Sequence, residues 1–188
     1  MGYKSLESCV TDLEKNGQLI RIEREVDPYL EMASIQLRAY EKGAAAILFE
    51  NVKGSKFRAL SNLFGDVDRS RFLFRDSMEM VQNIALLKKD PALALKNPLK
   101  YLSTPKHLFN ALPKKVSKRS AGMLETTIDQ LPQITCWKND GGPFVTLPIV
   151  YTEDADQPGW MKSNMGMYRI QLGGNDYIQN KEIGLHYQ

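Results

Sequence analysis

The sequence predicts an α+β protein with an N-terminal α/β domain, residues 1–122, followed by the first strands of an antiparallel sheet or barrel, residues 123–188. Three observations support this prediction. The first sixty residues alternate between helix-type and strand-type apolar patterns. A polar, basic segment at 114–122 then marks a domain boundary. After this boundary, short strand-like runs alternate with glycine-rich turns.

The first domain is expected to follow the order helix, strand, helix, strand, strand. Ser5 can cap the first helix, which Gly17 ends. A strand at 19–22, which can continue to 26, precedes a helix that starts after Asp27-Pro28 and ends at Gly43. Strands at 44–49 and 57–60 form a hairpin around the turn at 51–54. Apolar residues on these periodic faces are assigned to the core, namely Leu13, Ile35, Ile47, Leu48 and Phe49.

Residues 77–113 have a helical pattern that prolines divide into short pieces, at Pro91, Pro98, Pro105 and Pro113. Basic residues then crowd one segment, namely Lys106, Lys114, Lys115, Lys118 and Arg119. This segment is either a solvated linker or a contact for phosphate or a membrane surface.

The second domain is expected to contain strands at 134–137, 144–151, 166–172 and 183–188, with Pro148 interrupting the second. Trp137 is assigned to the core. Dense turn signals lie at 139–143 and 173–175. The last strand pattern has no stop signal, so the sequence predicts a truncated β-region, with a frayed C-terminus as the alternative.

Composition excludes several classes of protein. The formal net charge of +3 is too small to indicate nucleic-acid binding. Two distant cysteines, with no signal peptide and no long apolar run, favour the cytoplasm. No nucleophile elbow, phosphate loop or metalloprotease helix is present. Gly141-Gly142 is not a dinucleotide-binding fingerprint, because Pro143 follows, and it indicates a turn at which the backbone passes close to another group.

Residues 164–169 form the strongest candidate for a functional site. Asn164 offers a neutral oxygen for a hard cation, Gly166 permits a close backbone approach, and Arg169 presents a planar fork for phosphate or carboxylate. Strand alternation places Asn164, Gly166 and Tyr168 on one face and the intervening residues, with Arg169, on the other, unless a bulge intervenes. From these residues alone, an edge strand with an exposed arginine remains the alternative.

The segment Asn164-Met-Gly-Met-Tyr-Arg169 resembles the Asn-x-Gly-x-Tyr-Arg motif of the UbiD family of prenylated-flavin-dependent decarboxylases. The segments LPQITCW at 131–137 and DGGPFVT at 140–146 also resemble that family, in the same order and at similar spacing. N-terminal segments at 13–19, 26–28 and 46–54 resemble its opening domain. The resemblance covers nearly the whole chain.

This resemblance implies a non-oxidative decarboxylase of aromatic or α,β-unsaturated acids. Its cofactor would be prenylated FMN in a split β-barrel, held through phosphate by a divalent metal, usually manganese, and potassium. Asn164 matches a metal ligand, and Met167, Tyr168 and Arg169 match cofactor contacts. Arg169 also matches the catalytic arginine that positions the substrate carboxylate. His186, Tyr187 and Gln188 match the next cofactor-contacting segment.

The family's metal-binding glutamate and catalytic acids have no counterpart in this sequence, so the fragment alone is expected to be inactive. The expected substrate is a 4-hydroxybenzoate-type acid that can carry a polyprenyl tail, which also suggests peripheral contact with a membrane. The full-length protein is expected to form a homo-oligomer. A small phenolic-acid decarboxylase and a non-catalytic binding or assembly module are the alternatives.

Overall fold

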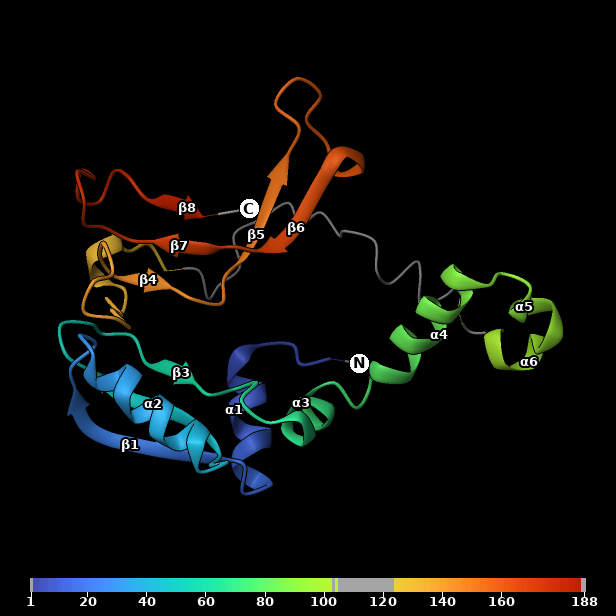
Figure 1. The fold of residues 1–188 in the computed structure, drawn as a ribbon, viewed down its shortest axis with the longest axis horizontal. Helices are drawn as coiled ribbons and strands as arrows, with labels where there is room; N and C mark the ends of the chain where they lie inside the picture. Colours follow the sequence, from blue (N-terminus) through green and yellow to red (C-terminus); the bar gives the residue numbers. More distant parts are fainter. Residues whose placement is uncertain (1, 103, 105–123, 187–188) are drawn as a thin grey trace.

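The computed structural model describes residues 2–102, 104 and 124–186, and shows a mixed α+β fold with small sheets (Figure 1). The helices and strands have the following bounds: α1 Leu6–Lys15, β1 Leu19–Val26, α2 Glu31–Glu41, β2 Ala46–Val52, β3 Ala59–Ser61, α3 Val67–Leu73, α4 Met78–Lys89, α5 Leu93–Lys96, α6 Pro98–Tyr101, η1 Ile128–Gln130, β4 Phe144–Val145, β5 Ile149–Glu153, η2 Trp160–Lys162, β6 Ser163–Met167, β7 Arg169–Gln171 and β8 Gly184–His186.

The N-terminal sheet has the strand order β1-β2-β3. Strands β1 and β2 are parallel and are connected through α2, whereas β2 and β3 form an antiparallel hairpin. This arrangement confirms the predicted order of elements. The side chain of Ser5 caps α1 by accepting a hydrogen bond from the backbone N–H of Ser8. Helix α3 was not predicted, although Asp66 caps it by accepting hydrogen bonds from two backbone N–H groups.

The core lies on both faces of β2. Ile47 and Phe49 pack with Met32 of α2 in one apolar cluster. Ala46 packs with Leu13 of α1 and with α3 in a second cluster. This division follows from strand geometry, because successive side chains point to opposite faces. The predicted core residues are confirmed as buried, except that Ile35 is only partly buried.

Helices α4 to α6 extend away from the N-terminal sheet (Figure 1). Helix α4 buries none of its residues in the described structure, and Val81 on its expected apolar face is 54% exposed. The helix therefore forms as predicted, but its apolar face is only partly covered by other described residues. The expected domain boundary at residue 122 and the basic residues from Lys106 to Arg119 lie outside the described part of the chain.

The C-terminal strands form two antiparallel sheets, β4-β7-β8 and β5-β6. Within residues 124–186 these sheets are separate and do not close into a barrel. Pro148 separates β4 from β5, as predicted. Three predictions were wrong. The strand expected at 134–137 is only an isolated bridge from Thr135 to Tyr29, the strand expected at 166–172 breaks at Tyr168, and Trp137 is 67% exposed.

Residues 128–135 attach the C-terminal strands to the N-terminal sheet. The backbone N–H of Leu30 donates to Thr135 O at 3.0 Å, and the Thr135 N–H donates to Pro28 O at 3.1 Å. The Ser55 hydroxyl donates to Gln130 O at 2.7 Å, and Ile134 packs against the N-terminal core. These contacts fix the point from which β4 begins. Among the described helices, none is both long and apolar enough to span a membrane.

Candidate functional site

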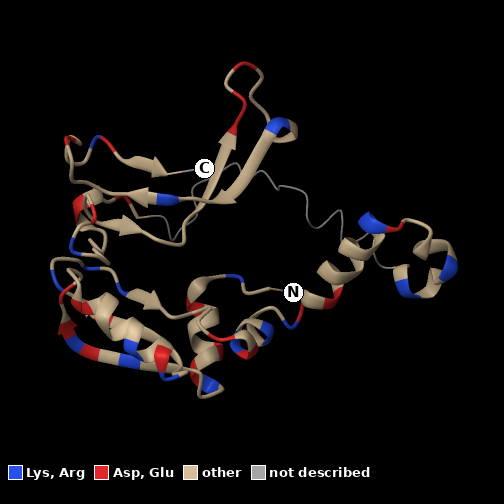
Figure 2. Cartoon of the chain, in the orientation of Figure 1, with Lys and Arg blue, Asp and Glu red and all other residues tan. Residues whose placement is uncertain are grey.

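The sheet β4-β7-β8 gathers five side chains into a group that we call the arginine cluster: Asp140, Phe144, Arg169, Gln171 and His186. Phe144 pairs with Gln171 across β4 and β7, and Arg169 pairs with His186 across β7 and β8. Arg169 and Gln171 are two residues apart on β7, so they share a face of the sheet. Asp140 joins them from the turn that precedes β4. Figure 2 shows that β4 to β8 are largely uncharged, so the Arg169 charge stands among neutral strands.

Two side chains hold the guanidinium of Arg169. Its Nη2 donates to Asp140 Oδ1 at 3.0 Å, and its Cζ lies 3.5 Å from the centroid of the Phe144 ring. The Arg169 side chain remains 39% exposed. Its Nε and Nη1 groups have no hydrogen-bond partner among the described residues. Since a guanidinium carries five N–H donors, most of its donors remain available to an anion.

Asp140 is itself fixed by a turn. Its backbone N–H donates to Trp137 O at 3.0 Å, and its Oδ2 accepts the Trp137 N–H at 3.1 Å. The carboxylate is only 12% exposed. The turn therefore presents one carboxylate oxygen to Arg169 while the other closes the turn.

Gln171 determines which atom His186 uses for hydrogen bonding. Gln171 is 1% exposed and its Nε2 donates to Gly173 O at 3.0 Å. Its Oε1, an acceptor, lies 3.1 Å from His186 Nε2, so that nitrogen carries the proton when the imidazole is neutral. The His186 ring meets the edge of Phe144 at a centroid distance of 5.4 Å. In that tautomer, Nδ1 is the His186 ring nitrogen that can accept a hydrogen bond.

Two glycine pairs make the turns of this region fit together. A Cβ added to Gly142 would overlap the carbonyl oxygen of Gly173, and a Cβ added to Gly174 would overlap that of Gly141. The expected close approach at Gly141-Gly142 is thus confirmed, and its partner is the backbone of the turn that follows β7.

The face predicted for Asn164, Gly166 and Tyr168 is confirmed. Asn164 Nδ2 donates to the Tyr168 hydroxyl at 2.7 Å. A Cβ on Gly166 would lie 2.6 Å from Tyr168 Cε2, so only glycine leaves room for the ring. With its Nδ2 engaged, Asn164 presents Oδ1 as the atom available to a cation.

The remaining predicted site residues lie apart from Asn164. Met167 pairs with Ile149 on the opposite face of the β5-β6 hairpin and is 65% exposed. The break at Tyr168 places Arg169 in the other sheet, paired with His186. Tyr187 and Gln188 lie outside the described residues. No group of three or more His, Cys, Asp or Glu side chains with metal-binding geometry occurs within residues 2–102, 104 and 124–186.

Cys136 adjoins the cluster without being activated by it. Burial, and next the negative charge of Asp140, raise the pKa of the Cys136 thiol, although Arg169 acts in the opposite direction. Because a thiolate is the nucleophilic form, this cysteine is unsuited to nucleophilic catalysis at neutral pH.

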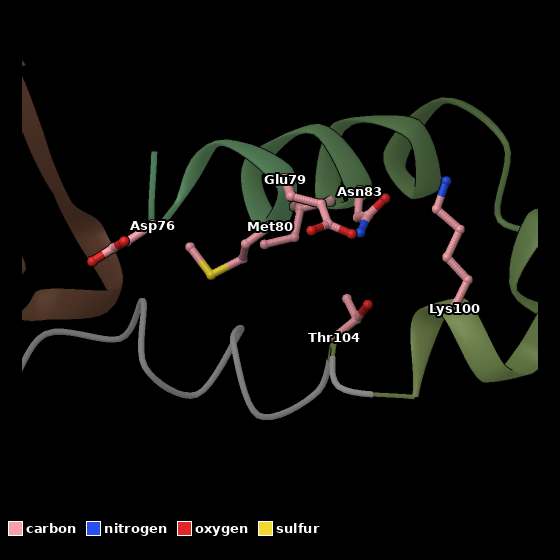
Figure 3. A pocket seen from close by; sticks show the side chains of 7 residues that line it. Asp76, Glu79, Met80, Asn83, Lys100 and Thr104 are labelled. Carbon is pink, nitrogen blue, oxygen red and sulfur yellow. The ribbon is translucent and has the colours of Figure 1, made fainter. Parts of the chain in front are cut away.

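A hollow of about 170 Å³ lies between α4 and the end of α6 (Figure 3). Glu79 and Asn83 reach it from α4, Lys100 comes from α6, and Thr104 follows that helix. These elements contribute nothing to the arginine cluster, and the side chains carry charges of both signs. The hollow therefore does not supply the missing part of the predicted site.

Sequence reasoning missed the roles of Asp140, Phe144 and Gln171. Asp140 stands in a turn signal, where aspartate is expected for purely local reasons. Phe144 and Gln171 follow ordinary strand alternation. Only the pairing of β4 with β7 brings them to Arg169.

Two family models match the chain. The 3-octaprenyl-4-hydroxybenzoate carboxy-lyase N-terminal domain matches residues 10–88. The Rift-related domain of the same carboxy-lyase matches residues 112–188. The chain therefore belongs to the UbiD family, as its sequence motifs predicted.

The similar proteins are longer than this chain. An uncharacterized protein of Chlamydia muridarum is 38% identical over 98% of this chain and 31% of its own length. One from Archaeoglobus fulgidus is 31% identical over the whole chain and 38% of its own length. The chain thus spans about a third of the length of these relatives.

Solved structures share the fold. Vanillic acid decarboxylase of Sedimentibacter hydroxybenzoicus, in its closed form, gives a TM-score of 0.68 at 24% identity, over 100% of this chain and 38% of that one. An evolved dimeric form of the UbiD-class enzyme HmfF from Pelotomaculum thermopropionicum, in complex with prFMN, gives 0.62 at 25% identity, over 99% and 39%.

Proposed function

We propose that the whole protein containing this chain is a non-oxidative decarboxylase of an aromatic acid that uses prenylated FMN and a divalent metal. One observation carries the proposal: within a chain of the UbiD family, Arg169 lies over the Phe144 ring and is ion-paired through one nitrogen, while its other nitrogens have no hydrogen-bond partner among the described residues. Such a fork suits a carboxylate or a phosphate.

The described residues fit the anionic part of a flavin better than its metal. Arg169 supplies a half-exposed cation, which a phosphate requires. Asn164 supplies one neutral oxygen, which suits a hard cation but does not complete a coordination shell. We propose that the other metal ligands, and the acid that protonates the product, belong to the rest of the whole protein.

In this proposal, the chain's own residues bind and orient. Arg169 aligns the substrate carboxylate through its fork, and Phe144 keeps the guanidinium plane in place by stacking. Asn164 holds the metal through Oδ1, with Tyr168 setting the orientation of the amide. Met167, His186, Tyr187 and Gln188 complete the proposed cofactor contacts. Prenylated FMN, when bound, supplies the electron-accepting group for loss of carbon dioxide.

The test is release of carbon dioxide from 4-hydroxybenzoate by the full-length protein supplied with prenylated FMN, Mn²⁺ and K⁺. Arg169→Gln should reduce kcat/KM at least about a hundredfold, because the fork would no longer orient the carboxylate. Arg24→Gln is the matched control, since Arg24 is an exposed arginine paired with Glu31. The absence of carbon dioxide release from any aromatic acid would instead favour a non-catalytic binding or assembly module.

A polyprenylated 4-hydroxybenzoate is the substrate that the matched family models name, and it is our first choice. The β5-β6 hairpin supports the choice of a substrate with a long apolar tail. Its residues Ile149 and Met165 expose 70% and 64% of their surface on one face, which such a tail could cover. The second candidate is a small phenolic acid, which the shared fold with vanillic acid decarboxylase favours. Comparing kcat/KM for 4-hydroxybenzoate with and without a prenyl chain distinguishes these substrates.

The two C-terminal sheets are further proposed to be part of a split β-barrel, and the full-length protein to be a homo-oligomer. The unclosed sheets and their exposed apolar face support both proposals. A crystal structure and a sedimentation measurement on the full-length protein test them separately.

A further inference from the structure

We propose that Asp140 is a positioning residue, which acts through Arg169 to fix the direction in which the guanidinium presents its free donors to an anionic ligand. This inference rests on the proposed function, because it assumes that Arg169 contacts the anionic part of the cofactor or substrate. It assigns a role to a residue outside the motif at 164–169.

Three hydrogen bonds hold Asp140 in place. One carboxylate oxygen accepts the Trp137 N–H at 3.1 Å and the other accepts from Arg169 Nη2 at 3.0 Å. The backbone N–H of Asp140 also closes the turn, on Trp137 O at 3.0 Å. The carboxylate is therefore a fixed acceptor, with 12% exposure, and it can impose an orientation on its partner.

Phe144 restricts only part of the orientation of the Arg169 guanidinium. The Arg169 Cζ lies 3.5 Å from the centroid of the Phe144 ring, so the cation–π contact keeps the guanidinium over the ring face. A stacked guanidinium can still rotate within that plane, because the ring face has no directional acceptor. The hydrogen bond from Nη2 to Asp140 restricts this rotation, and among the described residues Nε and Nη1 form no hydrogen bond.

A positioning effect of Asp140 on anion binding can be distinguished from the effect of its charge alone. Asp140 is a negative group beside the cation, so its charge alone opposes the binding of an anion. Removing that charge should then tighten anion binding. If Asp140 acts by positioning, its removal should weaken anion binding instead, because the donors lose their alignment. The two accounts therefore predict opposite signs.

Asp140→Asn separates positioning from a structural role in the turn. The asparagine Oδ1 can still accept the Trp137 N–H, so the turn is retained. Its Nδ2 group then faces Arg169, and two donors cannot bond to each other. Asp154→Asn is the matched control, since Asp154 also caps a turn, accepting from the N–H groups of Asp156 and Gln157, but forms no ion pair among the described residues.

The experiment measures the dissociation constant of FMN, used as the probe, for the full-length protein at fixed Mn²⁺ and K⁺. We expect Asp140→Asn to raise this constant about fivefold, Asp154→Asn to leave it unchanged, and Arg169→Gln to raise it about tenfold. In the double variant, Asp140→Asn should add nothing to the effect of Arg169→Gln, because it acts through that residue.

Three results would overturn the inference. Equal or tighter FMN binding by Asp140→Asn, while Arg169→Gln weakens it, would refute positioning and leave the proposed function standing. If Asp140→Asn raised the FMN dissociation constant as much in the Arg169→Gln background as in the unaltered protein, Asp140 would act through a residue other than Arg169. Unchanged FMN binding by Arg169→Gln would show that Arg169 does not contact the cofactor, and would overturn this inference while leaving the proposed contact of Arg169 with the substrate carboxylate standing.

Discussion

Strands β2 and β5 show how differently the two halves of the chain are built. Five of the seven residues of β2 are buried, whereas none of the five residues of β5 is. β2 has a strand on each side and helices over both faces. Among the described strands, β5 pairs with β6 alone, in a two-stranded sheet. The N-terminal half therefore contains a buried core, while β5 in the C-terminal half leaves its side chains largely exposed.

The β5-β6 hairpin gives the clearest example of exposed apolar side chains in the C-terminal half. Ile149 pairs with Met167 and Tyr151 pairs with Met165, so four exposed apolar side chains share one face. Asn164, Gly166 and Tyr168 occupy the opposite face. A two-stranded hairpin is marginally stable in water by itself. Among the described residues, nothing covers the apolar face of this hairpin enough to bury its four side chains.

The largest predicted contrast is in the contribution of apolar side chains to stability. Phe49→Ala should lower the free energy of unfolding by about 3–5 kcal/mol, because Phe49 is fully buried in the N-terminal core. Met167→Ala, at a side chain that is 65% exposed, should change it by less than about 0.5 kcal/mol. Urea unfolding followed by circular dichroism measures both, and similar losses for the two variants would contradict the comparison.

The second prediction concerns glycines. Gly174→Ala should destabilise the protein by about 3 kcal/mol, because φ is +86° and the new Cβ would overlap the Gly141 carbonyl. Gly17→Ala, with φ of +66° and open space around it, should cost only about 1 kcal/mol. Thermal unfolding of both variants tests this order. A larger loss at Gly17 would mean that the backbone approach between the two C-terminal turns is not as tight as described.

The third prediction concerns Tyr168. Tyr168→Phe retains the ring over Gly166 but removes the acceptor that orients the Asn164 amide. The affinity of the full-length, FMN-supplied protein for Mn²⁺ should fall about threefold, measured by electron paramagnetic resonance. Tyr151→Phe is the control, since that hydroxyl donates to Glu153 on the hairpin. An equal effect in the control would indicate that the hairpin as a whole, and not the amide orientation, sets the affinity.

The smallest expected effect is the dependence of N-terminal stability on pH. The Tyr3 hydroxyl and then Arg75 lower the pKa of Asp12 in the folded protein. Its stabilising contribution is thus complete above the unfolded pKa, about 3.9, and is lost as the pH falls through the lower folded pKa. Asp12→Asn should flatten the acid limb of the stability curve below about pH 4. An unaltered acid limb would show that this cluster is not coupled to folding.

Sequence patterns were most informative where local signals and burial agree. The apolar run in β2, the Ser5 cap and the glycines of the turns each specify their own structure, and the N-terminal order followed from them. The break at Tyr168 could not be predicted, because residues 166–172 alternate without interruption and only the change of pairing partner separates β6 from β7.

The candidate site likewise has features that the sequence predicted and features that it did not. The shared face of Asn164, Gly166 and Tyr168 follows from strand periodicity alone, and was predicted. The ion pair between Asp140 and Arg169 joins residues 29 positions apart through a sheet pairing that no local pattern encodes. Trp137 was assigned to the core, but it follows residue 136 into the turn that Asp140 closes and is 67% exposed.

We propose that Asn164 and Arg169 belong to one cofactor site. Anomalous scattering from Mn²⁺ in crystals of the full-length protein grown with FMN tests this proposal most directly. We expect a manganese peak about 2.2 Å from Asn164 Oδ1 and the FMN phosphate beside that metal. The Nε or Nη1 group of Arg169 should lie within about 3 Å of an anionic oxygen of the cofactor or substrate. Manganese and flavin bound elsewhere, with Asn164 and Arg169 both free of ligand, would contradict it.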